Sequence, residues 1–284
     1  MDLALEESLE NFCISQLQSA ESTHQVLDEF FSVPRPDSLN ILKAASGHSL
    51  GAKLCLASAL ATGINFVLEK RVFGNDNEKT QFKVADFYQL MLPFHFEGKT
   101  NQSAPYDQGW RVITKTSEAY YHAAIAFLKL FDLKGQALVD FPSVEWLFEQ
   151  MGNKKAGIIL SVNNRFTLEQ LFENKGVDYS GSGPKVLLDG QYQDFDAGTH
   201  VVSVFGKEDN KVILADPFYP VKHFKSCVFK VKTKVLDSYL RQPAQGIVFS
   251  KTEFNFPSQH LRPIYIPEQV EKEIGRIRTE LKLS

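Results

Sequence analysis

The chain has 284 residues, of which 43% are hydrophobic, and this is enough for one or two packed domains. Its net charge is −3, and its lysines and arginines are dispersed, which argues against nucleic-acid binding. No apolar run reaches the roughly 18 residues that a transmembrane helix needs. The acidic, amphipathic start at Met1–Glu7 lacks the basic and apolar regions of a signal peptide. We therefore expect a cytoplasmic protein with no membrane span, and export without a leader stays open.

The first part of the chain has the apolar spacing of helices. Residues 2–32 are expected to form a helical pair, either packed on the core or lying over a cleft as a regulatory segment. A stronger pattern follows Cys55, because the apolar residues after it fall on one helical face. Further helices are expected at 82–92, 117–127 and 143–148, the last of them capped by Ser143.

From residue 157 the pattern changes to short β-rich runs, and the order of helices followed by strands predicts an α+β fold. Strands of a mostly antiparallel sheet are expected at 157–162, 186–189, 198–206, 211–216, 227–231 and 246–249. Residues 163–198 form a long insertion, which we interpret as either a lid over a site or surface decoration. A helix from Pro267 onward is expected to dock on the body or on a second copy of the chain.

Two of the expected strands form a hairpin, joined by the polar turn Lys207–Asn210. His200 opens the first strand and Asp216 closes the second, so antiparallel pairing brings the two side chains to one rim of the sheet. An imidazole oriented by a carboxylate is the general-base half of a nucleophilic triad. The plainer alternatives are a core histidine and an aspartate that ends a strand before Pro217. Asp194, Asp196 and Asp209 are alternative carboxylates.

Cys55 is the candidate nucleophile for this general base. A loop containing Gly and Ser precedes it, and the helix pattern places it in the first helical turn, where the helix dipole favours a thiolate. The alternative is a small buried apolar residue. Cys13 and Cys227 are interpreted as structural, because neither follows such a loop. With only three widely spaced cysteines and no histidine ligand motif, we expect no disulfide framework, no metal and no other cofactor.

The Cys55 helix and the hairpin from His200 to Asp216-Pro217 resemble the bacteriocin-processing cysteine peptidases that cleave double-glycine leaders, and their stand-alone relatives. The resemblance covers residues 46–250. It implies a papain-like fold, in which the helical half carries the cysteine helix and the sheet carries the histidine and aspartate. It also implies that Cys55 is the nucleophile, His200 the base and Asp216 its orienting carboxylate, with a peptide or protein as substrate.

This chain departs from the family pattern at two positions. Leu56 stands where family members usually carry Gly, and Ser49 stands where they usually carry the Gln that donates to the oxyanion. A serine hydroxyl is a shorter donor, and loss of one oxyanion donor costs roughly 10²–10³ in rate. Gln108 and His48 are alternative donors, although neither has the expected spacing.

The sequence therefore predicts an N-terminal helical segment (1–45), a papain-like peptidase domain (46–252) and a C-terminal extension with a helix (253–284). The first functional hypothesis is a cysteine peptidase or related thiol acyltransferase with a Cys-His-Asp triad. The second is a catalytically inactive papain-like module that binds a peptide or a partner protein. A third is an assembly protein that oligomerises through its terminal helices. The oligomeric state stays open.

Overall fold

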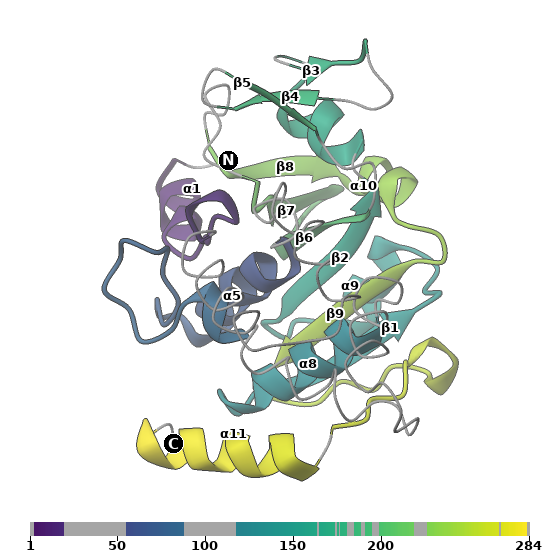
Figure 1. Ribbon diagram of the computed structural model, residues 1–284. Helices are drawn as coiled ribbons and strands as arrows, with labels where there is room; N and C mark the ends of the chain where they lie inside the picture. The colour runs from purple at the N-terminus through teal and green to yellow at the C-terminus, as the bar shows by residue number, and fades with distance from the viewer. Residues whose placement is uncertain are drawn as a thin grey trace, which may run out of the picture.

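The structure, a computed structural model, describes residues 3–19, 55–87, 118–163, 165–173, 175, 177–180, 185–188, 191–194, 199–218, 226–266 and 268–282. It is an α+β fold built on a six-stranded sheet with the strand order β1-β9-β2-β6-β7-β8 (Figure 1). Neighbouring strands of this sheet are antiparallel. The expected fold class is confirmed. The strands are β1 (Lys134–Val139), β2 (Gly157–Asn163), β6 (Thr199–Glu208), β7 (Lys211–Ala215), β8 (Val228–Lys232) and β9 (Gln245–Ser250).

Helices cover both faces of the sheet, so its strands bury side chains in both directions. On one face, α5 (Cys55–Leu68) and α8 (Glu118–Lys129) share an apolar cluster with strand residues such as Ile159. On the other face, α9 (Val144–Met151) and α10 (Thr233–Tyr239) pack against the strand neighbours Ile158 and Leu160. The alternation of neighbouring side chains between the two clusters follows the two-residue period of a strand.

The helix α5 lies very close to the sheet, and almost all of its side chains are buried. Two glycines allow this approach. A Cβ atom on Gly63 would lie 2.8 Å from Phe249 Cζ, and one on Gly157 would lie 2.3 Å from the same atom. Real Cβ atoms do not come this close, so the Phe249 ring requires glycine on both sides. The contact fixes the height at which α5 sits above β2 and β9.

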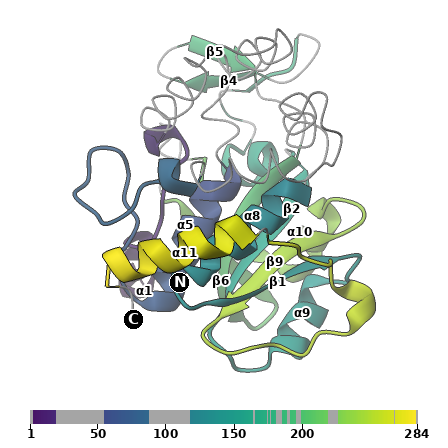
Figure 2. The same cartoon turned by 60° about the horizontal axis from the view of Figure 1, so that its bottom comes forward.

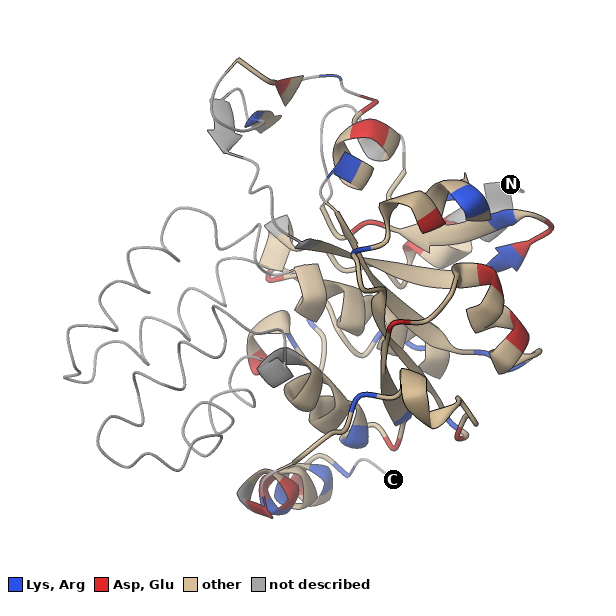
Figure 3. Ribbon diagram, turned by 90° about the vertical axis from the view of Figure 1, so that its right-hand side faces the viewer, with Lys and Arg blue, Asp and Glu red and all other residues tan. Residues whose placement is uncertain are grey.

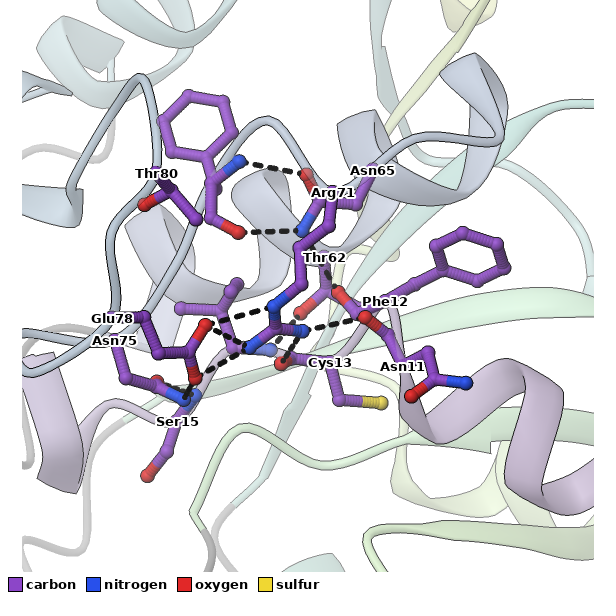
Figure 4. Close-up of polar contacts among 12 residues, drawn as sticks. Asn11, Phe12, Cys13, Ser15, Thr62, Asn65, Arg71, Asn75, Glu78 and Thr80 are labelled. Atoms are coloured by element: carbon purple, nitrogen blue, oxygen red, sulfur yellow. Dashed lines mark hydrogen bonds and ion pairs between the residues drawn. The ribbon is translucent and has the colours of Figure 1, made fainter.

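The N-terminal segment is an integral part of this body. It comprises α1 (Leu3–Glu10), a non-helical stretch and the short 3₁₀ turn η1 (Leu17–Ser19). Figure 4 shows how polar side chains within and after α5 hold the backbone of the N-terminal segment. Thr62 Oγ1 accepts from Ile14 N at 2.9 Å, and Asn75 Oδ1 accepts from Ser15 N at 3.0 Å. The expected helix over 2–32 is therefore wrong for residues 11–16, whose backbone bonds to α5 and its following loop instead. Residues 20–32 lie outside the described part.

The remaining sequence expectations for helices differ in outcome. The helix expected at 117–127 is α8, and α9 begins as expected with Ser143, whose Oγ accepts from Trp146 N at 3.1 Å. The helix expected at 82–92 is seen at residues 84–87, and its remainder lies outside the described residues. The strand β1 and the helix α10 were not expected from the sequence.

The insertion between β2 and β6 has a small sheet of its own (Figure 1, top). It contains β3 (Val177–Asp178), β4 (Lys185–Leu188) and β5 (Gln191–Asp194), preceded by one π-helical turn, η2 (Thr167–Leu171). Its apolar cluster consists of Leu168, Phe172, Val186 and Phe218, with Val177 beside it. Phe218 comes from the body, so the insertion is anchored there.

The C-terminal helix α11 (Glu268–Glu280) packs along α8, as Figure 2 shows. Val270 and Ile274 are buried in the contact, and Arg278 donates to the Lys129 carbonyl at 3.0 Å. The helix expected from Pro267 onward thus docks on the body. A short 3₁₀ turn, η3 (Ser258–His260), lies in the connection that leads to it.

Charged side chains of both signs are interspersed along the described elements (Figure 3). Most ion pairs join exposed side chains, such as Lys272 and Glu268 at 2.8 Å, and pairs of this kind add little to stability. The two apolar clusters therefore carry the fold. Within the described residues, no helix is both long and apolar enough to cross a bilayer.

Candidate active site

The β6–β7 hairpin brings His200 and Asp216 into direct contact. His200 Nε2 lies 2.8 Å from Asp216 Oδ1, and the two residues are 3% and 0% exposed. β6 runs two residues closer to the turn than expected, through Glu208, while β7 begins at Lys211 as expected, and the register shifts by one residue between Val204 and Gly206. His200 and Asp216 lie at the opposite end of the hairpin from this turn, at the rim of the sheet.

The carboxylate of Asp216 is fixed by contacts on both oxygens. Besides the contact with His200, Oδ1 accepts from Phe218 N at 2.9 Å, and Oδ2 accepts from Thr167 Oγ1 at 2.7 Å. The backbone N–H of Asp216 donates to the Cys227 carbonyl at 3.3 Å. Because these groups hold the carboxylate from several sides, it presents a fixed oxygen to the imidazole.

Cys55 is the first residue of α5 and is 7% exposed. Its side chain lies within hydrogen-bonding reach of the His200 ring. Since Asp216 occupies Nε2, the ring nitrogen left for the thiol is Nδ1. Ser203 Oγ, three residues along β6 from His200, donates to the Ala59 carbonyl of α5 at 2.8 Å. This bond ties the first turns of α5 to β6.

The His200 imidazole is strongly perturbed by its neighbours. Burial lowers the pKa of His200, but the charge of Asp216, its hydrogen bond and the contact with Cys55 outweigh burial and raise this pKa from 6.5 to about 10. The ring is therefore protonated at neutral pH while it touches the thiol.

The other two cysteines have different surroundings. Cys13 is 1% exposed, and its thiol donates to the Leu9 carbonyl at 3.6 Å. Burial raises the pKa of the Cys13 thiol well above its usual value, and contact with Cys227 raises it further. Cys227 is buried in the same apolar cluster. Both residues are buried in the core, and for Cys227 this environment was expected from its place in a strand pattern.

The alternative site residues named from the sequence are not brought to this place, or fall outside the description. Asp209 lies in the hairpin turn at the far end of the two strands, with a left-handed φ of 52°. Asp194 is in β5, where it pairs with Lys185 in the separate small sheet. The tentative oxyanion donor Ser49, its substitutes His48 and Gln108, and Asp196 lie outside the described residues.

Sequence reasoning did not identify two residues next to the site. Thr167 binds Asp216, and the sequence signal available for it was a threonine ahead of a short helical run. Gln16 donates its backbone N–H to the Pro217 carbonyl at 2.9 Å, next to Asp216, and is 0% exposed. Neither polar atom of its side chain has a hydrogen-bond partner among the described residues, and the same is true of the fully buried Ser58 Oγ in α5.

No metal centre is formed by the described residues, since their histidine, cysteine and acidic side chains form no group of three or more that could hold a metal ion. Two cavities are present away from the site. One of about 630 Å³ lies between α8, β1 and α11, and one of about 610 Å³ lies between α9 and the β6–β7 hairpin. Neither is lined by the cysteine, histidine or aspartate of the candidate site.

Comparison with known proteins gives a distant structural neighbour. No protein-family model matches the sequence, and no curated protein matches it. A crystal structure of a protein from Bacillus anthracis, provisionally described as a C39-like peptidase, aligns with 14% identity and a TM-score of 0.29. The alignment covers 48% of this chain and 59% of that one. The chain thus spans less than two thirds of this neighbour, and the function has to be argued from the site itself.

Proposed function

We propose that the protein is a papain-like cysteine peptidase, or a related thiol acyltransferase, that acts on peptide amide bonds through Cys55, His200 and Asp216. The observation that carries this proposal is the buried His200–Asp216 pair with the Cys55 thiol of a helix N-terminus against the same imidazole. An acid–base pair adjoining a thiol at a helix start is the arrangement that activates a cysteine nucleophile.

In the proposed reaction, the Cys55 proton resides on His200 and the thiolate attacks the carbonyl carbon of the substrate. The new C–S bond places a negative charge on the carbonyl oxygen, which the Cys55 backbone N–H stabilises. When the intermediate collapses, the C–N bond breaks and His200 gives its proton to the leaving amine. Water or another nucleophile then releases the acyl group from sulfur. Asp216 holds the ring tautomer throughout.

The proposal extends to the surroundings of the site. We assign the acyl chemistry to residues 46–252, with a peptide or protein as substrate and Ser49 as the second oxyanion donor. A cytoplasmic setting fits the three free cysteines, because reducing compartments keep thiols unpaired. The terminal segments 1–45 and 253–284 would support this domain.

The test is selective alkylation with an iodoacetamide-type reagent at about pH 6, where an ordinary thiol is almost entirely protonated. Site mapping by mass spectrometry should show labelling of Cys55 well ahead of Cys13 and Cys227. The His200→Ala variant should lose this preference, since it removes the imidazolium. Labelling of Cys55 at or below the level of Cys13 would contradict the proposal.

A second candidate is an inactive papain-like module that binds a peptide or partner protein. Two observations favour it. Cys55 is only 7% exposed, and Ser49 and Leu56 stand at positions where the peptidases that the sequence resembles carry Gln and Gly. Acylation by a peptide thioester separates the two. An enzyme forms a thioester on Cys55, and Ser49→Gln should raise this rate by at most about 10²-fold while alkylation stays unchanged. In a binding module, Cys55 forms no thioester with the peptide, whether or not the reagent alkylates it.

A further inference from the structure

The insertion between β2 and β6 reaches the site through one hydroxyl group. We propose that Thr167 is a positioning residue for Asp216, and that through it the insertion (residues 165–194) sets the state of the Cys55–His200 pair. The inference rests on the proposed function, since it concerns the carboxylate of that triad. It gives the insertion a part in the chemistry that neither a lid nor surface decoration would have.

The geometry makes Thr167 the partner of a specific oxygen. Its Oγ1 donates to Asp216 Oδ2 at 2.7 Å, and both residues are 0% exposed. The other oxygen, Oδ1, is already hydrogen-bonded to His200 Nε2 and accepts from Phe218 N. Among the described residues, Thr167 is the one hydrogen-bond donor to Oδ2. Without it, a buried charged oxygen would be left unpaired, and such a loss is costly because no water reaches the atom.

Thr167 is itself held in place by aromatic packing. It begins the π-helical turn η2, in which Phe172 N donates to the Thr167 carbonyl at 3.0 Å. The preceding Phe166 is 0% exposed and lies 6.1 Å from the Phe229 ring of β8 and 5.6 Å from the Tyr239 ring of α10. A hydroxyl on a turn fixed in this way is preorganised for the carboxylate.

A second attachment joins the insertion to the same turn of the chain. Phe218 lies two residues after Asp216, and its ring centroid is 6.0 Å from that of Phe172. Both rings belong to the cluster that contains Leu168 and, from β4, Val186. Movement of η2 or β4 would therefore displace the groups on both sides of Asp216. A ligand that binds one position of the insertion more tightly than another would therefore change the reactivity of the Cys55 thiol.

The test compares two substitutions by the pH profile of Cys55 alkylation. Thr167→Val keeps the shape and removes the hydroxyl, so the hold of Asp216 on the imidazolium weakens. We expect the acid limb of the profile to move to higher pH and the rate at about pH 6 to fall by about tenfold, as one pKa unit implies. Thr167→Ser keeps the hydroxyl and should restore the profile. The pH profile of Cys55 alkylation is a suitable readout, because a loss of stability alone does not shift it.

Thr233→Val is the matched control. Thr233 is also a buried threonine, 6% exposed, and its Oγ1 donates to the Asn210 carbonyl at 3.1 Å near the hairpin turn. This variant should lose stability and keep the alkylation profile of the wild-type protein. If the profile of Thr233→Val shifted as far as that of Thr167→Val, the shift would reflect a general loss of stability, and the inference would be overturned.

Two further results separate this inference from the proposed function. If wild-type Cys55 titrates like an ordinary thiol, the proposed function fails and this inference fails with it. If wild-type Cys55 reacts at low pH and Thr167→Val has the same profile, the positioning role is overturned while the proposed function stands. Should Thr167→Val not fold, Phe172→Leu loosens the second attachment at smaller cost. It should shift the profile in the same direction, and an unchanged profile would again overturn the inference.

Discussion

Asp216 Oδ1 and His200 Nε2 lie 2.8 Å apart at the open end of the β6–β7 hairpin, and both side chains are buried. A buried pair of this kind is not a general source of stability, because both groups lose their hydration. It does make each partner depend on the other, since removal of one leaves an uncompensated polar group in the interior. Several measurable properties follow from this dependence.

Asp216→Asn tests the role of the carboxylate directly. The amide is almost the same size but cannot stabilise an imidazolium or hold the required tautomer. We expect acylation of Cys55 by a peptide thioester to fall by roughly 10²- to 10⁴-fold. Asp237→Asn is the control, because Asp237 Oδ1 accepts from Val144 N at 2.8 Å and caps α9 away from the site. Equal rates for the two variants would contradict the assignment of Asp216.

The dependence of stability on pH tests the His200 pKa. Folding raises this pKa from 6.5 to about 10, so the folded protein binds the proton more tightly than the unfolded chain. The stabilisation is complete below about pH 6.5 and is lost as pH rises from there to about pH 10, by up to a few kcal/mol. Urea unfolding across this window measures it. The His200→Gln variant should give a flatter curve, and parallel curves would show that the pKa is not raised.

Gln16→Met should make the protein more stable. The Gln16 side chain is fully buried and neither of its polar atoms has a partner in the part of the chain that the structure describes, which is an unfavourable state for an amide. An apolar side chain of similar length removes this cost, and we expect the free energy of unfolding to rise by about 1–2 kcal/mol. Thermal or urea unfolding is the measurement. A destabilised variant would mean that the amide has a partner, such as a bound water, in solution.

Asn65→Leu should have the opposite effect. Asn65 Oδ1 accepts from Val72 N and Phe73 N, each at 2.9 Å, and Nδ2 donates to the Phe12 and Phe73 carbonyls. Leucine would remove all four of these hydrogen bonds, at a cost of about 3–5 kcal/mol. Gln16→Met is measured in the same unfolding assay. Opposite changes in the free energy of unfolding would show that the hydrogen bonds of a buried amide, and not its burial, decide whether its replacement stabilises the protein.

The sequence allowed prediction of those parts of the fold and candidate site that depend on local patterns. His200 and Asp216 meet across a single hairpin, so alternation and one turn suffice to place them together. The start of α5 at Cys55 follows from apolar periodicity. The contact between Cys55 and His200 was expected through a resemblance, because no local pattern relates residues so far apart in the chain.

The features that were missed depend on distant partners. Thr167 and Asp216 are 49 residues apart, and nothing in the sequence around either one specifies the other. β1 contains Gly135 and Gln136 and becomes a strand by pairing with β9, near the end of the domain. The non-helical course of residues 11–16 is likewise set by Thr62 and Asn75, which outweigh the helical spacing of the segment itself.

The N-terminal segment has a consequence for the order of folding. Synthesis runs from the N-terminus, so Glu10 and Gln16 are made well before their partners: Ser226, which donates to Glu10, follows 216 residues later, and Pro217, which accepts from Gln16, is similarly distant. Contacts across such long stretches of chain form slowly and late. A nascent chain therefore carries Cys55 and its helix until the later strands are made, without the histidine, the aspartate or the turn that complete the candidate site. Under the proposed function, the nucleophilic chemistry of Cys55 is withheld over that interval, so a growing chain that has not yet reached Asp216 does not attack itself or its neighbours.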